Sequence, residues 1–185
     1  ACRHSRDAVP PRRIAGDLRG AVTIGPYRIA ALYKGRRRLK PLSGLDSLFL
    51  HLETPATPMH VGAAHLLELP KGYRRDYLAD VKRHVARRLH LSPVFTRQLA
   101  PMPLDFANPV WVRAERVDLD RHVLSVRLPK PGTMAQLEAT IARLHAKPLD
   151  RDRPLWAFHV IEGLQSGQPA FYTKIHHATL DGAAG

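Results

Sequence analysis

At 185 residues, with 44% hydrophobic residues and a formal net charge of +13, the chain can form one domain with an adequate core or two small ones. No apolar run approaches the roughly 20 residues that cross a bilayer. The stretch from Ala21 to Tyr33 lacks the pattern of a signal peptide. Cys2 is the only cysteine, which excludes a disulfide framework and a thiolate zinc site and argues against a cysteine nucleophile. We therefore expect a cytoplasmic protein without a transmembrane segment.

The positive charge is concentrated in the first 40 residues. They hold 11 Lys and Arg against 2 acidic side chains, whereas the 145 residues that follow hold 18 basic and 14 acidic ones. A basic run can bind the phosphates of nucleic acid or of anionic lipids, but such runs are more often solvated tails. We interpret residues 1–40 as a basic, disordered tail or linker and residues 41–185 as the folded domain. Nucleic acid is not the partner we expect.

The first part of the predicted domain holds two helices and a strand. Ser43 can cap a short helix that ends before Pro55. The run 60–69 predicts a largely buried strand, and residues 75–91 predict an amphipathic helix. Its apolar stripe consists of Leu78, Val81, Val85 and Leu89. We expect this stripe to pack against a sheet, although the basic flank also permits contact with a lipid surface.

The second part of the predicted domain is richer in strands. Residues 110–112 predict a short strand, and 122–128 alternate apolar and polar residues as a second strand does. A helix capped at Thr133 or its glycine neighbour follows. Residues 157–162 and 170–175 predict two strands joined by a hairpin turn. The order β-α-β-β-α-β-β predicts an α+β fold with two layers, a sheet and its helices.

One motif directly follows the last predicted strand, His176-His177-Ala178-Thr179-Leu180-Asp181-Gly182. Histidine takes up and releases a proton near neutral pH, and a nearby acid can orient its ring. Because adjacent side chains of a strand point to opposite faces, one ring would face a reaction centre and the other would belong to the scaffold. Asp181 would support the turn that leaves the strand.

From these residues alone, three interpretations of the motif remain open. The first is a general base for a hydroxyl or amine substrate. The second is a metal site, although adjacent histidines on a strand diverge and no further cluster of ligands is evident. The third is a pair of ordinary histidines in a turn. The histidines outside the motif, which we interpret as surface or satisfied structural residues, are His51, His60, His65, His84, His90, His122, His145 and His159.

Two further blocks accompany the motif. One runs from Pro148 to Trp156 and contains Pro154-Leu155-Trp156, and the other runs from Leu45 to Pro55 and continues into Met59-His60-Val61-Gly62. In this order and spacing, the blocks resemble the bacterial and plant family of wax ester synthases and diacylglycerol O-acyltransferases over residues 41–185. That family has a fold like chloramphenicol acetyltransferase and shares the HH-xxx-DG signature with the condensation domains of peptide synthetases. The resemblance implies the N-terminal half of a two-domain enzyme, which would have little or no activity alone.

The resemblance also implies roles for the motif residues. His177 would be the general base, with His176 and Asp181 in support, and Gly182 would let the backbone turn close to the substrate. Pro154, Leu155 and Trp156 would shape the acceptor pocket or hold the motif strand, or Trp156 would simply belong to the core. These three residues and Gly182 are our candidates for substrate binding or structural support.

The implied reaction moves a fatty acyl group from acyl-CoA to diacylglycerol or to a long-chain alcohol. Acyl-CoA is a co-substrate, no acyl-enzyme forms, and no cofactor or metal is expected. Peripheral contact with a membrane or lipid droplet would fit such substrates. Two alternatives stay open: a catalytically silent module that binds lipid or nucleic acid, and a condensation or acetyltransferase relative with an amine acceptor.

Overall fold

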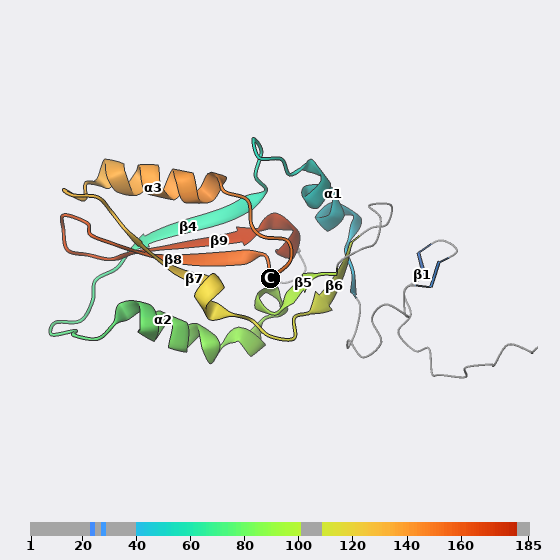
Figure 1. Ribbon diagram of the computed structural model, residues 1–185, viewed down its shortest axis with the longest axis horizontal. Coiled ribbons are helices and arrows are strands. Elements are labelled where there is room, and N and C mark those ends of the chain that lie inside the picture. The colour runs from blue at the N-terminus through green and yellow to red at the C-terminus, as the bar shows by residue number, and fades with distance from the viewer. Residues whose placement is uncertain (1–22, 25–26, 29–39, 101–108, 181–185) are drawn as a thin grey trace, which may run out of the picture. The chain divides into compact units, whose positions relative to one another are not determined.

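A four-stranded sheet is the framework of the folded body. In the computed structural model, which describes residues 23–24, 27–28, 40–100 and 109–180, the strand order is β4-β9-β8-β7 (Figure 1). The strands are β4 His60–Leu66, β7 Val123–Arg127, β8 Trp156–Glu162 and β9 Ala170–His176. β9 pairs antiparallel with β4 and β8, and β7 runs parallel to β8. The strand that ends in the motif is therefore bonded on both sides.

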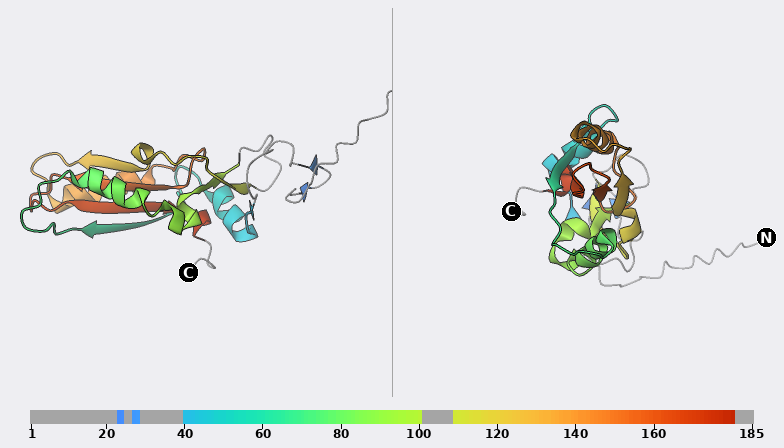
Figure 2. Two further views of the ribbon diagram at one scale, coloured as in Figure 1. Left: turned by 90° about the horizontal axis from the view of Figure 1, so that it is seen from below. Right: turned by 90° about the vertical axis from the view of Figure 1, so that its left-hand side faces the viewer.

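Helices cover both faces of this sheet. The stripe of α2 (Tyr77–Ala86) packs against Trp156 and Phe158 on one face, as its spacing predicts. The apolar residues of α3 (Met134–Ala146) pack against Ile161 and Tyr172 on the other face. Figure 1 and the end-on view of Figure 2 show α2 and α3 on opposite sides of the sheet. The predicted α+β fold of sheet and helices is confirmed, with three layers in place of two because α2 and α3 take opposite faces.

A second, smaller sheet lies beside the end of the motif strand. It has the order β3-β6-β5, formed by Lys40–Pro41, Val110–Arg113 and Arg97–Leu99. Helix α1 (Gly44–Leu52) shares a core cluster with Trp111 of this sheet and with Leu155 and Ala178. The sequence predicted β6 as a short strand but not β5. Together α1 and the small sheet form the surroundings of the motif.

Helices α1 and α3 begin where the sequence signals place them. Ser43 Oγ accepts a hydrogen bond from Asp46 N (3.0 Å) at the start of α1. Thr133 and Gln136 form a reciprocal capping box at the start of α3. The helix predicted over residues 75–91 is shorter at both ends, because α2 runs from Tyr77 to Ala86 and is capped by Asp76. Four 3-10 turns complete the described part of the chain, at Leu89–Leu91, Pro93–Phe95, Leu119–Arg121 and His177–Thr179.

The prediction for residues 60–69 was wrong in two respects. β4 ends at Leu66, and every residue after His60 in this strand is exposed instead of buried. β4 is an edge strand that pairs with β9 alone within the described residues. The apolar run includes Gly62, Ala63 and Ala64, and such small side chains give little surface to bury.

Residues 1–34 and 35–185 form two separate compact units. In the first unit β1 (Thr23–Ile24) and β2 (Tyr27–Arg28) pair antiparallel. The other residues of the predicted tail up to 39 lie outside the described part, so the division at 40/41 stays a prediction. None of the helices described here is long and apolar enough to cross a membrane.

Candidate active site

The two motif histidines have opposite environments. β9 ends at His176, which is fully buried, and the 3-10 turn that follows begins at His177, which is exposed. The backbone N–H of His177 donates to Met59 O (2.8 Å). The rings therefore diverge, as alternation along a strand requires.

Backbone contacts fix His176 within the scaffold. Its N–H donates to Leu155 O (3.0 Å), and its carbonyl accepts from Thr179 Oγ1 (2.8 Å). Its ring atom Nδ1 accepts from the backbone N–H of Ala178 (3.0 Å). These bonds hold the turn from which the next ring projects.

His177 has an aromatic neighbour on α1. Its ring stacks on Phe49, with centroids 4.1 Å apart and an interplanar angle of 28°. Because the residue is exposed, a ring supported on one face still offers its edge to a substrate. A general base needs this combination of a fixed position and access to the proton that it takes.

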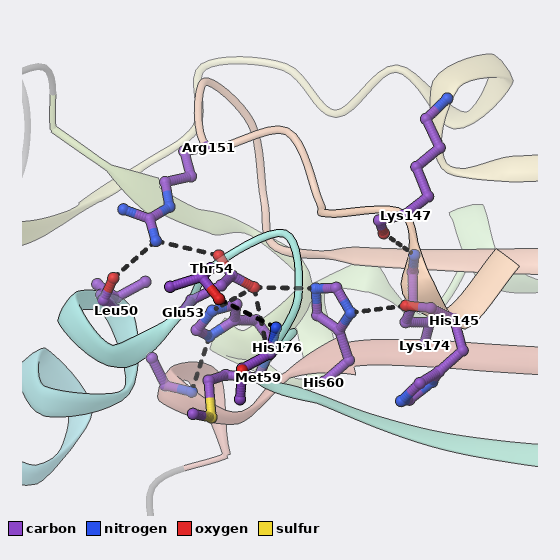
Figure 3. A network of polar contacts seen from close by, with 12 residues as sticks. Leu50, Glu53, Thr54, Met59, His60, His145, Lys147, Arg151, Lys174 and His176 are labelled. Carbon is purple, nitrogen blue, oxygen red and sulfur yellow. Dashed lines mark hydrogen bonds and ion pairs between the residues drawn. The ribbon is translucent and has the colours of Figure 1, made fainter. Parts of the chain in front are cut away.

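Glu53, at the end of the same helix, contacts the other motif histidine. It caps α1, and its N–H donates to Phe49 O (3.2 Å). Its Oε1 lies 3.3 Å from His176 Nε2 and 3.2 Å from His60 Nε2 (Figure 3). Residues 49 and 53 are spaced i, i+4 and lie on the same helix face. One face of α1 thus meets both motif histidines.

Arg151 fixes the end of α1. Its Nη2 donates to Glu53 Oε2 (3.0 Å) and to Leu50 O (2.7 Å) (Figure 3). Arg151 shortly precedes the Pro154-Leu155-Trp156 block in sequence. Arg151 therefore connects the segment just before this block to α1, through an ion pair with Glu53 and a hydrogen bond to the end of the helix.

The Pro154-Leu155-Trp156 block is part of the core. All three side chains are fully buried, and Leu155 packs with Leu50 and Ala178. The indole N–H of Trp156 donates to Phe95 O (3.2 Å). This placement fits the role of holding the motif strand, and contact of the block with an acceptor stays a prediction.

Arg97 supports the turn after the motif strand. Its Nη2 donates to Thr179 O (2.6 Å), and its guanidinium lies over the ring of Trp111, 4.8 Å from the centroid. Asp181 and Gly182 lie outside the described residues, so their predicted roles are open.

Burial dominates the electrostatics of the site. It lowers the pKa of His176 from 6.5 to about 4, against the opposing charge of Glu53. Burial also raises the pKa of Glu53, but the hydrogen bond from Arg151 and the attraction of His176 outweigh it, so this pKa is lowered. At neutral pH His176 is therefore an uncharged ring beside an acidic group.

The sequence interpretation missed Glu53, Arg151 and the part played by His60. All three stand in the quoted blocks, but nothing local in the sequence shows that Glu53 and His60 meet His176. His122 is a satisfied structural residue as predicted, because its Nδ1 bonds to Trp156 O (2.8 Å). His159 was misjudged: it is buried, and its Nδ1 has no hydrogen-bond partner among the residues that the structure describes.

In the described part of the chain, no group of three or more His, Cys, Asp or Glu is arranged to hold a metal ion. The exposed imidazole of His177 is held by a buried, hydrogen-bonded strand end, and such an imidazole is suited to proton transfer.

The chain resembles known acyltransferases. A family model described as the wax ester synthase/diacylglycerol acyltransferase catalytic domain matches residues 42–185. A probable diacyglycerol O-acyltransferase of Mycobacterium tuberculosis H37Rv is 38% identical over 139 residues, covering 75% of this chain and 31% of that protein. A putative one of Mycobacterium bovis is 40% identical over 147 residues, covering 80% and 32%. The chain belongs to the wax ester synthase/diacylglycerol acyltransferase family.

Solved structures agree with this assignment. The wax ester synthase/diacylglycerol acyltransferase from Marinobacter aquaeolei VT8 has a TM-score of 0.66 and 38% identity, covering 78% of this chain and 36% of that one. The starter condensation domain of rhizomide synthetase has a TM-score of 0.56 at 12% identity, covering 76% and 32%, and shows the fold alone. The chain spans about a third of the length of these relatives.

Proposed function

We propose that the complete protein containing this segment transfers a fatty acyl group from acyl-CoA to the hydroxyl of diacylglycerol or of a long-chain alcohol. The observation that carries the proposal is the placement of His177: it is exposed, stacked on Phe49 and fixed at the end of the motif strand. Family membership supports the reaction class.

In this reaction His177 acts as the general base. It takes the proton from the acceptor hydroxyl while that oxygen attacks the thioester carbonyl of acyl-CoA. The tetrahedral oxyanion then collapses, the C–S bond breaks, and the imidazolium returns its proton to the leaving thiolate of CoA. No acyl-enzyme forms and no cofactor takes part, so acyl-CoA is a co-substrate only.

The reaction is tested with the complete product of the gene that encodes these residues. Labelled acyl-CoA is supplied with diacylglycerol, with a long-chain alcohol or with a long-chain amine, and the products are separated by chromatography. We expect triacylglycerol or wax ester. Transfer to the amine alone would favour the condensation-type alternative, and transfer to none of the three would refute the proposal.

Peripheral contact with a lipid surface is a second part of the proposal. It rests on the basic residues 1–40, because each Lys or Arg near an anionic membrane adds roughly 1 kcal/mol of attraction. The intact protein and a variant without residues 1–40 are compared for binding to anionic and to neutral vesicles. We expect deletion to remove a salt-sensitive binding to anionic vesicles. Equal binding of both proteins would contradict this part.

A further inference from the structure

A buried carboxylate oxygen lies between two imidazoles. Glu53 Oε1 is 3.2 Å from His60 Nε2 and 3.3 Å from His176 Nε2 (Figure 3). The side chains of both histidines are completely buried and that of Glu53 is 5% exposed. Neither Nε2 has a hydrogen-bond partner of good geometry within the described residues. The protons of these groups must therefore be placed from their other contacts.

The other contact of His176 fixes its tautomer. Its Nδ1 accepts the N–H of Ala178, so this nitrogen carries no proton. A neutral imidazole has one N–H, which must then be on Nε2. His176 thus presents a donor to the carboxylate oxygen of Glu53.

The other contact of His60 gives the opposite result. Its Nδ1 lies 3.1 Å from the carbonyl oxygen of His145, which can only accept, so Nδ1 carries a proton. In a neutral ring Nε2 would then be a bare lone pair 3.2 Å from Glu53 Oε1. Two buried acceptors at this distance repel one another, unless a further proton lies between them.

We propose that Glu53, His60 and His176 form a proton-sharing unit in which one proton is held between His60 and Glu53 while His176 donates its Nε2–H to the same carboxylate. Glu53 is thereby the positioning residue of the motif strand. The unit is distinct from the exposed ring of His177, which stacks on Phe49 instead.

Charged and polar groups from several elements face this unit. His145 lies in the last turn of α3, and a helix C-terminus attracts a cation. The groups that face the unit are Arg151 on Glu53, His145 on His60, and Lys174, whose Nζ donates to the α3 carbonyl of Leu144 (2.6 Å). Burial is the largest cause acting on His60 and, with the charge of Lys174, lowers its pKa, although the carbonyl of His145 and the carboxylate of Glu53 act in the opposite direction. Because the two groups lie 3.2 Å apart, the proposed shared proton belongs to the pair and not to either group alone.

The tautomer of His176 also separates this unit from a metal site. A neutral imidazole that ligates a metal through Nε2 carries its proton on Nδ1. Here Nδ1 accepts the N–H of Ala178, which a protonated Nδ1 could not do. The cluster of one carboxylate and two imidazoles is thus arranged to share protons.

The consequence for catalysis rests on the proposed function. α1 holds His177 through Phe49 and His176 through Glu53, one turn further along the helix. Loss of the carboxyl contacts of Glu53 would loosen the strand end that carries the base. A base misplaced by a fraction of an ångström slows the chemical step rather than substrate binding.

The protons are located by NMR of the complete protein labelled with 15N in histidine and 13C in the glutamate carboxyl groups. We expect His176 as the neutral tautomer protonated on Nε2. We also expect one proton in the His60–Glu53 pair at neutral pH, seen either on His60 Nε2 or on the carboxyl group. A bare His60 Nε2 beside an ionised Glu53, or a His176 protonated on Nδ1, would overturn the proposal.

The positioning role is tested with the isosteric variant Glu53→Gln. Glu68→Gln, which makes the same change at an exposed site after β4, is the matched control. We expect kcat of Glu53→Gln to fall roughly ten- to hundredfold with KM for acyl-CoA unchanged, and Glu68→Gln to keep the wild-type rate. Equal rates for both variants would refute the positioning role. A wild-type protein without acyl transfer would refute the proposed function and leave the NMR result standing.

Discussion

At the scale of single residues, the two adjacent histidines His176 and His177 have different roles: one is a buried structural residue and the other is exposed. His176 is held by its backbone, by the N–H of Ala178 and by Glu53, whereas the ring of His177 contacts Phe49 and is exposed. Strand alternation predicted that the rings would diverge. Which ring is buried could not be read from the sequence, because it depends on helices that pack on the strand.

This division predicts unequal effects on stability. His176→Ala leaves a cavity and a backbone N–H without its acceptor, so we expect a loss of about 2 to 4 kcal/mol in the free energy of unfolding. His177→Ala removes one exposed stacking contact and should cost less than about 1 kcal/mol. Urea unfolding of the two variants measures the difference. Equal losses would contradict the assigned environments.

The burial of His159 makes the free energy of unfolding depend on pH. Burial, with Lys174 and Lys147 adding to it, lowers its pKa from 6.5 to about 4. Between these values the unfolded chain binds a proton that the folded chain does not, so stability falls as the pH drops from 6.5 to 4. His159→Leu removes this contribution to the pH dependence of stability. It also removes a buried nitrogen that has no hydrogen-bond partner among the described residues.

Unfolding titrations of the wild type and of His159→Leu across this pH range test the assignment. We expect the pH-dependent loss of unfolding free energy to be smaller in the variant by up to about 3 kcal/mol. His65→Leu, at an exposed position of β4, is the control and should keep the wild-type pH dependence. The same pH dependence in wild type and His159→Leu would show that His159 does not titrate as its burial requires.

At the scale of elements, α1 contacts both the small sheet and the motif. Its start at Ser43 was predicted from a cap and an apolar face, and the structure confirms it. Its contacts with the motif could not be predicted in the same way. Glu53 and His176 meet only because β4 and β9 pair antiparallel, with His60 opposite His176, which brings the C-terminal end of α1 to the end of β9.

The start of α3 gives a prediction of its own. Gly132 has φ +80, and an added Cβ would overlap the carbonyl oxygen of Gly163 in the turn between β8 and β9. Gly72 has the same φ with nothing near its Cβ. We expect Gly72→Ala to cost about 1 kcal/mol for its backbone conformation and Gly132→Ala clearly more, because only it must also displace the turn.

Thermal and urea unfolding of these two variants measure the difference. If Gly132→Ala and Gly72→Ala lose the same free energy of unfolding, the close approach of the α3 start to the hairpin turn is not a constraint on the fold.

At the scale of the whole molecule, local signals predicted most elements and much less of their assembly. The cap at Thr133, the stripe of α2 and the alternation of β9 were each sufficient to place an element. The exposure of β4 was not predictable, since the same apolar sequence pattern occurs in edge strands and in inner strands. The proton-sharing unit escaped prediction for a similar reason, as its members come from α1, β4 and β9.

The fold itself does not select the acceptor. The condensation domain of rhizomide synthetase and the Marinobacter acyltransferase both match this chain in structure. The acceptor is therefore argued from the family to which the chain belongs, while the unequal roles of the histidines are argued from the site. The central claim is that the exposed His177, and not the buried His176, is the base.

The most direct test measures acyl transfer by the complete protein with His177→Ala, beside its unfolding free energy. His65→Ala, which removes an exposed histidine of β4, is the control. We predict that His177→Ala stays folded and that its kcat falls roughly 10²- to 10⁴-fold, as loss of a general base does, while His65→Ala keeps the wild-type rate. A folded His177→Ala protein with a rate within a few-fold of the wild type would contradict the account.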